Sequence, residues 1–468
     1  MIPGGSCKHG KSLCFRLTFA ILDRTGRQCK WVTIRLPLAE AHPVTPSVVP
    51  SEAPVAARGL RRLAAALHHR DFRVLWFGAC FSSIGTWMQS LAENWLVLSL
   101  TASAFYLGLD AFLQQVPIML FTLIGGVVAD RYDRRITLMA SQWVQLSTAA
   151  ALAALVYFGV VEIWHILLLS FITGTAQAFG GPAYQSLIPS LVGKQDLTNA
   201  IALNSIQFNV ARMLGPLLAG GTLVILKQWG VSDMTALAIC FGLNALSFLA
   251  VILSLMSLHI KHMAAARAHN MFAELKQGLA YVREERSIRA LMVLGAATAF
   301  FGIPMLTLLP VFARDVFGSG VEGYSMLLSF SGAGAVVGAM VVAWLGRFAR
   351  MGFTTLLVQA CFGVIIALIA LTPSLYLTCV LLFASGVTLM IVVSCLMSLV
   401  QLIAPNEMRG RVMSIYLVAF RGGMPLGSLA SGSLASITSA PNVLAFNGVA
   451  LIAVSVYFLM KTKEIRAL

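Results

Sequence analysis

Charged side chains are scarce in this sequence, and this scarcity limits what the protein can be. They make up 11% of its 468 residues, whereas 58% of the residues are hydrophobic. Soluble domains carry about 25% charged and roughly 45–50% apolar residues. A surface of this composition does not suit water. The sequence therefore argues against a soluble enzyme or binding module and indicates a protein embedded in lipid.

The sequence also lacks the motifs of several chemistries. Its 8 cysteines form no CxxC pair. No histidine pair has the spacing of metal ligands, and no phosphate-binding loop or Ser/His/Asp cluster is present. We therefore expect no enzymatic activity, no cofactor, no metal site and no disulfide framework. The lack of a phosphate-binding loop also argues against an ATP-driven pump.

Long apolar runs are what the sequence has in abundance. Runs of about 20 residues alternate with short polar joints, and each run is long enough to cross a ~30 Å hydrocarbon layer as a helix. The pattern predicts an all-α membrane protein with about twelve transmembrane helices. We place them near residues 72–98, 105–129, 136–158, 163–187, 200–226, 234–258, 288–312, 323–346, 353–372, 375–402, 411–438 and 441–460.

Basic residues gather on one side of the predicted spans. The chain through Arg73 holds twelve Lys and Arg residues, and the later joints on the same side hold seventeen, whereas the opposite joints hold only Lys227 and Arg314. Loops rich in Lys and Arg stay in the cytoplasm. This bias predicts both termini in the cytoplasm. It also explains the net charge of +15 without a nucleic-acid partner.

The composition divides the chain into five expected segments. Residues 1–58 contain several prolines and no long apolar run, which indicates a disordered leader or sequence upstream of the true start. Two six-helix bundles are expected at 59–258 and 288–460, joined by a linker at 259–287. Residues 461–468 form a cytoplasmic tail.

The linker carries an amphipathic pattern. Phe272, Leu275, Leu279 and Val282 recur at helical spacing, and charged residues occupy the other side. Such a pattern is typical of a helix that lies at the inner membrane surface.

The two halves show weak internal similarity. Arg212 precedes Pro216 by four residues in the fifth span, and Arg421 precedes Pro425 by four residues in the eleventh. A repeat of six spans is a recurrent transporter plan, with the substrate site between the two halves.

A charged motif between the second and third spans carries the clearest resemblance to a known family. Its residues are Gly126, Asp130, Arg131, Asp133, Arg134 and Arg135. A glycine, an Asp-Arg pair four residues later and a following basic pair resemble the signature of the major facilitator superfamily. The family's second glycine is replaced by Asp133, so the turn there is expected to differ.

Two stretches of the first span narrow the resemblance. Residues 69–76 and 85–89 are similar to the bacterial branch that includes enterobactin-type exporters. The resemblance covers about residues 70–460. It implies the major facilitator fold, export by alternating access, and a place in the inner (plasma) membrane of a bacterium.

The charged motif is expected to act as a cytoplasmic gate. An anionic Asp130 is attracted to the partial positive charge at a helix N-terminus, and the resemblance implies that this is the eleventh span near Arg411. Such a latch would stabilise the state that is closed to the cytoplasm. The arginines would pair with the two Asp residues or with anionic lipid. The alternative is a plain basic loop.

Glu93 is the best candidate for proton coupling. A charged residue at membrane depth costs about 2.5–3.5 kcal/mol on insertion scales and therefore marks function by default. Gly78, Ser82, Gly85, Gln89 and Glu93 recur at 3–4 residue spacing, so they form one polar face that is expected to line a cavity. The alternative is a structural glutamate that bonds a neighbouring helix.

Asp110 and two embedded arginines are further candidates. Asp110 is a second proton-coupling candidate, although a charge at the membrane rim fits it as well. Arg212 is expected to pair with Glu93, to hold an anionic group of the substrate, or to bond backbone groups. Arg421 occupies the matching place in the second half.

Other residues are candidates on weaker grounds. We expect the following side chains to line a substrate cavity: Gln89, Gln177, Tyr184, Gln185, Arg212, Phe301, Met305, Ser398 and Arg421. The segment Gly215, Pro216 and Gly220 is similar to the antiporter motif of drug exporters and is expected to bend the fifth span. Simple helix packing explains the segment equally well.

The sequence therefore predicts a proton-coupled exporter of small amphiphilic molecules such as siderophores, drugs or metabolites. The expected partners are a small-molecule substrate, membrane lipid and a proton, with the chain acting as a monomer. Two alternatives stay open. One is a facilitator of lysophospholipids or similar lipids, and the other is a non-transporting membrane sensor on the same scaffold. The polar faces of the first, fourth and fifth spans favour transport.

Overall fold

The structure is a computed structural model that describes residues 14–22, 29–37, 65–258, 271–346 and 348–462. The chain divides into two compact units, residues 1–58 and 59–468. The first unit contains β1 (Cys14–Leu22) and β2 (Cys29–Pro37), which pair antiparallel with Cys14 opposite Pro37. The two strands differ from the disorder expected for this segment. Their Phe, Ile, Val and Thr residues favour strands over coil.

The second unit is helical. Its elements are η1 (Ala65–His68), α2 (Arg70–Thr101), α3 (Ala104–Arg131), α4 (Arg134–Tyr157), α5 (Ile163–Leu191), α6 (Leu197–Gln228), α7 (Asp233–Met256), α8 (Met271–Glu284), α9 (Arg286–Ala297), η2 (Thr298–Gly302), α10 (Pro304–Val311), η3 (Phe312–Val316), α11 (Gly320–Leu345), α12 (Met351–Leu371), α13 (Leu375–Ile403), α14 (Arg409–Ile437) and α15 (Ala440–Lys461).

The helices supply the expected number of membrane spans. Within the described residues, eleven helical stretches are long and apolar enough to cross a membrane, and α9, η2, α10 and η3 together form one of them. Helix α2 is 32 residues long, which is also enough to cross a membrane, but it is not among these eleven. It is less apolar than the others because Gln89, Glu93 and Asn94 lie within it. The predicted all-α fold with about twelve spans is confirmed.

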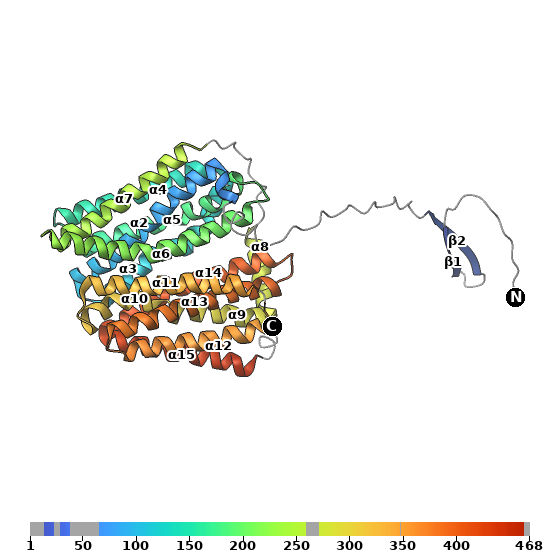
Figure 1. The fold of residues 1–468 in the computed structure, drawn as a ribbon. Helices are drawn as coiled ribbons and strands as arrows, with labels where there is room; N and C mark the ends of the chain where they lie inside the picture. Colours follow the sequence, from blue (N-terminus) through green and yellow to red (C-terminus); the bar gives the residue numbers. More distant parts are fainter. Residues whose placement is uncertain (1–13, 23–28, 38–64, 259–270, 347, 463–468) are drawn as a thin grey trace, which may run out of the picture. The chain divides into compact units, whose positions relative to one another are not determined.

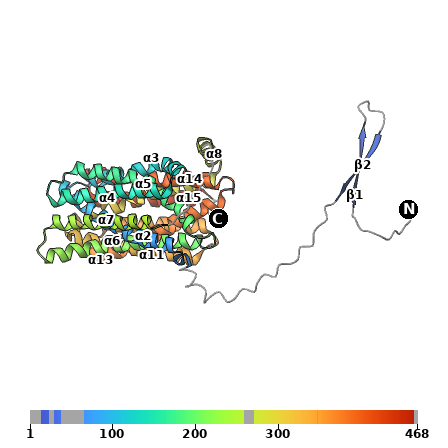
Figure 2. The same ribbon diagram turned by 90° about the horizontal axis from the view of Figure 1, so that it is seen from above.

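The spans form two bundles that meet along their length. Figure 1 shows α2 to α7 on one side and α9 to α15 on the other, and the two groups overlap in the view from above in Figure 2. Helix α3 packs against α14, and α6 packs against α11. At the first contact Gly108 lies directly against Gly432, where any side chain would collide with the facing backbone. Small residues of this kind let helices in lipid approach closely.

Helix α8 packs at one end of the second bundle. It runs over Met271–Glu284, within the predicted linker, while residues 259–270 lie outside the described part of the chain. Gly278 of α8 lies against Arg411 at the start of α14, and Arg411 donates a 2.7 Å hydrogen bond to the Gln277 side chain. A position of α8 at the membrane surface stays a prediction.

Candidate functional site

A cavity lies between the two bundles. It is closer to the end where α2 meets α3, which we call the Thr101 end, than to the end where α3 meets α4, which we call the Arg131 end. Its volume is about 130 Å³, which is room for several water molecules. Its polar lining residues are Ser90, Glu93, Asn94, Asp110, Gln114, Arg212, Thr307, Tyr324 and Ser331. Its apolar lining residues are Trp87, Ala111, Pro216, Leu306 and Leu328.

Two acidic side chains face this cavity from neighbouring helices. Glu93 of α2 is 5% exposed and Asp110 of α3 is 4% exposed. The hydroxyl of Ser170, on α5, lies 2.7 Å from Glu93 Oε1 and 2.6 Å from Asp110 Oδ1. The three side chains therefore form one hydrogen-bonded cluster that joins α2, α3 and α5. The sequence indicated both acids, but Ser170 went unnoticed because a serine within an apolar run carries no signal of its own.

A second set of hydrogen bonds fixes Glu93 from the side of α7. Gln89 donates a 3.1 Å bond to Glu93 Oε2, and Asn244 of α7 donates a 2.7 Å bond to the Gln89 oxygen. Gly78 and Gly85 lie against serine and asparagine side chains of α7. The polar face expected to line a cavity therefore packs mainly against α7, and Glu93 alone of that face reaches the cavity. The small residues on this face allow α7 to approach.

Arg212 faces the same cavity and forms no ion pair with an acid in the described part of the chain. Its guanidinium carbon lies 5.8 Å from the ring centre of Trp87, a geometry that suits a cation over an aromatic face. Its Nη2 atom is buried and has no hydrogen-bond partner among the described residues. Among the described ion pairs, none joins Arg212 to Glu93. The pairing of these two residues that we considered is therefore absent in this conformation.

The helix-bending segment of α6 forms a contact between the bundles. The hydroxyl of Ser325, on α11, donates a 2.7 Å hydrogen bond to the Pro216 carbonyl oxygen. Gly220 lies against the same serine, and Gly215 lies against Trp87 of α2. All three residues of the segment thus allow close packing around the cavity, and Pro216 itself lines it.

Several predicted cavity residues lie elsewhere. Gln177 and Gln185 are exposed on α5, Arg421 is exposed on α14, and Tyr184 donates a 3.1 Å hydrogen bond to Asn204 of α6. Ser398 is half-buried in α13. None of these five residues lines the cavity described above.

The seventh span presents different residues from those expected. Phe301 packs against Phe446 of α15, with ring centres 6.3 Å apart, and Met305 is fully buried in the apolar core. Leu306 and Thr307 line the cavity instead. The π-helical segment η2 precedes them. A π-helical turn accommodates an extra residue and so shifts which side chains face inwards.

The charged motif makes contacts within the first bundle. Asp133 accepts hydrogen bonds from the backbone N–H groups of Arg135 and Ile136 and so caps α4. Arg134 donates a 3.0 Å bond to the Ser186 carbonyl oxygen. Arg135 donates a 2.9 Å bond to the Met256 carbonyl oxygen at the end of α7.

The remaining residues of the motif provide no contact that tests the gate. Arg131 is exposed, Gly126 faces open space, and the side chain of Asp130 lies outside the described part of the structure. The latch between Asp130 and α14 therefore stays a prediction.

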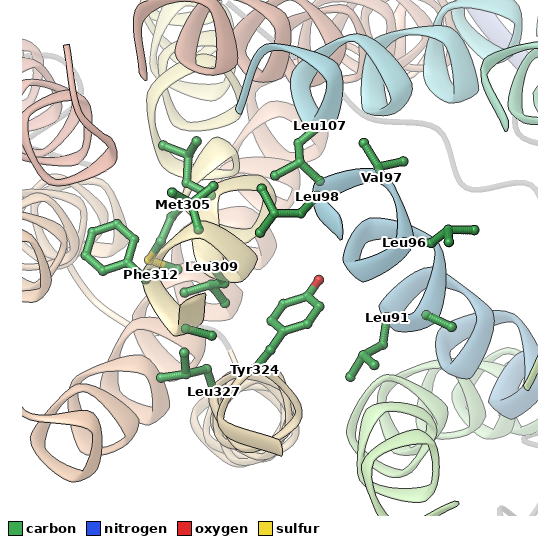
Figure 3. Packing of buried hydrophobic residues seen from close by; sticks show 14 of the residues in the cluster. Leu91, Leu96, Val97, Leu98, Leu107, Met305, Leu309, Phe312, Tyr324 and Leu327 are labelled. Carbon is green, nitrogen blue, oxygen red and sulfur yellow. The ribbon is translucent and has the colours of Figure 1, made fainter. Parts of the chain in front are cut away.

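The Thr101 end of the molecule is closed by apolar side chains from both bundles. Figure 3 shows Leu98 and Leu107 of the first bundle facing Met305 and Leu309 of the second, with the Tyr324 ring below them. These residues belong to one buried cluster. Leu98 and Leu107 lie closer to the Thr101 end of their helices than the cavity residues Glu93 and Asp110 do.

Polar contacts reinforce this closure. Arg314 of η3 donates a 3.0 Å hydrogen bond to the Leu98 carbonyl oxygen and a 3.5 Å bond to the Ala102 carbonyl oxygen. A cation at the C-terminal end of a helix is stabilised by the helix dipole. Lys227 of α6 lies 3.9 Å from Glu322 of α11 and adds a weaker contact.

Comparisons with known proteins agree with this fold. The chain is 26% identical over 392 residues to the staphyloferrin A transporter of Staphylococcus aureus, covering 82% of this chain and 94% of that protein. It is 26% identical over 373 residues to the multidrug efflux pump Tap of Mycolicibacterium fortuitum, covering 77% and 88%. It is also 22% identical over 280 residues to macrolide efflux protein A of Streptococcus pyogenes, covering 60% and 67%.

Solved structures resemble the chain in fold. A mutant of the nucleoside transporter NupG matches with a TM-score of 0.63 at 15% identity, covering 84% of this chain and 99% of that one. A bacterial homologue of the lysosomal transporter Spinster, inward-facing and unoccupied, matches with a TM-score of 0.63 at 14% identity, covering 85% and 95%.

These likenesses identify a multi-pass membrane transporter rather than an enzyme. The sequence profile of the transmembrane secretion effector family matches residues 63–467. The chain therefore belongs to this family of major facilitator superfamily transporters.

Proposed function

We propose that this protein exports small amphiphilic molecules by alternating access and that a proton drives the export. The observation that carries the proposal is the placement of Glu93 and Asp110 in one cavity between the two bundles. A carboxyl group that is buried at membrane depth is costly unless it has a role. An acid that alternately faces two sides of a membrane can carry a proton across it.

The proposal assigns the Thr101 end to the outside of a bacterial plasma membrane. The basic residues of the later joints gather towards the Arg131 end, which the positive-inside rule places in the cytoplasm. The closed Thr101 end then corresponds to a conformation that takes up substrate from the cytoplasm. Opening of this end, with closure around Asp130, would release the substrate outside.

The substrate class follows from the walls of the cavity and from the relatives. Trp87, Leu306 and Leu328 offer apolar surface beside the acids and Arg212. A pocket that offers apolar walls beside several polar groups suits an amphiphilic ligand. The relatives named above handle a siderophore, macrolides and multiple drugs. We therefore include siderophores and amphiphilic drugs among the candidate substrates.

Accumulation assays test this function directly. Cells with and without the protein are loaded with candidate siderophores, drugs and lysolipids, and a protonophore is added to half of each set. We expect lower accumulation of at least one siderophore or drug in cells that contain the protein, and loss of this difference with the protonophore. Equal accumulation of every compound would favour the sensor alternative. Movement of lysolipids alone, insensitive to the protonophore, would favour the lipid facilitator.

The gate motif yields a separate prediction. Asp130→Asn removes the charge that is proposed to hold the N-terminus of α14, so the conformation open at the Arg131 end should gain population. We expect faster thiol labelling of Ser205→Cys, an exposed position in the Arg131 half of α6, in a cysteine-free background. Asp133→Asn is the matched control, because asparagine also caps helices well. An unchanged labelling rate in Asp130→Asn would reject the latch.

A further inference from the structure

The two short contacts between Ser170 and the acids need more hydrogen atoms than the serine hydroxyl alone supplies. Ser170 is 2% exposed, and its Oγ lies 2.7 Å from Glu93 Oε1 and 2.6 Å from Asp110 Oδ1. Both distances are those of O–H···O hydrogen bonds. A serine hydroxyl supplies one hydrogen and can accept others through its lone pairs. It can therefore donate to one of the two carboxyl groups only.

The second short contact needs a hydrogen atom that comes from the carboxyl group itself. If both acids were ionised, one negative oxygen would face the serine oxygen at close range with no hydrogen between them. Such a contact is costly where water is excluded. If one acid carries a proton, its O–H donates to Ser170, and Ser170 donates to the other acid. The state with a single proton satisfies both contacts.

The surrounding groups indicate where this proton rests. Glu93 receives a second hydrogen bond from Gln89, whose amide is oriented by Asn244. Asp110 has no second donor among the described residues. Hydrogen bonds to a carboxylate favour its ionised form. Glu93 is thus better suited to the negative charge, and Asp110 to the proton.

We propose that Ser170 joins Glu93 and Asp110 into a single site that holds one exchangeable proton. The inference rests on the proposed function, because it assigns the coupling proton to this site. When the Asp110 proton passes to Ser170 Oγ, the hydrogen of Ser170 passes to Glu93 Oε1, so the proton moves between the acids without a net loss. Ser170 is a positioning residue in this scheme. Arg212 on α6 and Tyr324 on α11 are the other titratable groups that line the cavity.

A pair of substitutions separates this role from simple packing. Ser170→Ala removes the hydroxyl at small cost in volume, whereas Ser170→Thr retains it. Loss of a hydrogen bond to a charged group corresponds to roughly a tenfold or larger effect. We expect export driven by a pH gradient to fall at least about tenfold in Ser170→Ala and its pH profile to change, while Ser170→Thr stays close to wild type. Equal rates and pH profiles in all three proteins would overturn the proposal.

Infrared spectroscopy tests the proton without relying on transport. The carbonyl stretch of protonated carboxyl groups is followed during a pH titration of purified protein, with Glu93→Gln and Asp110→Asn used to assign the bands. In the wild type we expect one protonated carboxyl group from this pair at neutral pH and two well-separated titration steps, because the bridge stabilises the state with one proton. Ser170→Ala should bring the two steps together, and Ser170→Thr should not.

The two measurements distinguish the two proposals. A wild-type protein that shows the single-proton titration but no proton-driven export would reject the proposed function and leave the shared site intact. A wild-type protein that exports in response to a pH gradient, but whose two acids are both ionised at neutral pH, would reject the shared site alone. Identical titrations of wild type and Ser170→Ala would also reject it.

Discussion

Glu93→Gln is expected to abolish export driven by a pH gradient while the protein still inserts and folds normally. Glutamine has nearly the same shape and keeps an oxygen that can accept the Ser170 hydroxyl bond. It cannot ionise, so Asp110 loses the acid with which it is proposed to exchange a proton as the bundles move. The substitution also replaces a group that is costly at membrane depth by a neutral one. The loss should therefore concern coupling rather than stability.

The measurement compares three proteins in inverted vesicles energised by an imposed pH gradient. Glu93→Gln should transport at the level of vesicles that lack the protein, with a normal amount of protein in the membrane. Glu407→Gln is the matched control, because it makes the same chemical change at an exposed carboxylate in the joint before α14 and should transport like wild type. Exchange of substrate across the membrane without a gradient should survive in Glu93→Gln. Normal pH-driven export in Glu93→Gln would remove this residue from the coupling mechanism.

The fold was accessible from the sequence because the bilayer imposes strong rules on spans. An apolar run of about 20 residues must form a helix in lipid, and the expected spans correspond to the observed helices α2 to α7 and α9 to α15. The strands β1 and β2 were missed because the segment around them contains scattered charges and prolines and no long apolar run. The two π-helical segments were missed because no residue pattern marks them. One of them, η2, directly precedes the stretch in which Leu306 and Thr307, rather than Phe301 and Met305, line the cavity.

Only part of the candidate site could be predicted from the sequence. Ionisable residues stand out in an apolar sequence, so Glu93, Asp110 and Arg212 were recognised, and the structure brings all three to one cavity. Serine and threonine are common in membrane helices, where they bond their own backbone. Ser170 and Ser331 therefore carried no signal. Their importance depends on which neighbouring helix each one faces, and that is a property of the packing alone.

Arg314→Gln is expected to open the Thr101 end of the transporter. Arg314 links the two bundles at this end, because its guanidinium bonds the Leu98 and Ala102 carbonyl oxygens at the C-terminus of α2. Hydrogen bonds that involve a charged group contribute about 1.5–3 kcal/mol. Their loss should raise the ratio of the conformation open at this end to the closed one by roughly ten- to hundredfold. The apolar cluster around Tyr324 remains in Arg314→Gln and still favours the conformation closed at the Thr101 end.

Distances between spin labels report this opening without reference to membrane orientation. One label is placed at Ser99, at the end of α2, and the other at Tyr376, at the start of α13, because both positions are exposed at the Thr101 end of different bundles. In Arg314→Gln the distribution should gain a population at longer distance. Lys227→Gln breaks the 3.9 Å contact with Glu322, and exposed pairs of this kind contribute about 0–1 kcal/mol, so its distribution should stay near that of wild type. If Arg314→Gln also left the distribution unchanged, apolar packing alone would hold this end closed, and the bonds to α2 would have no part in gating.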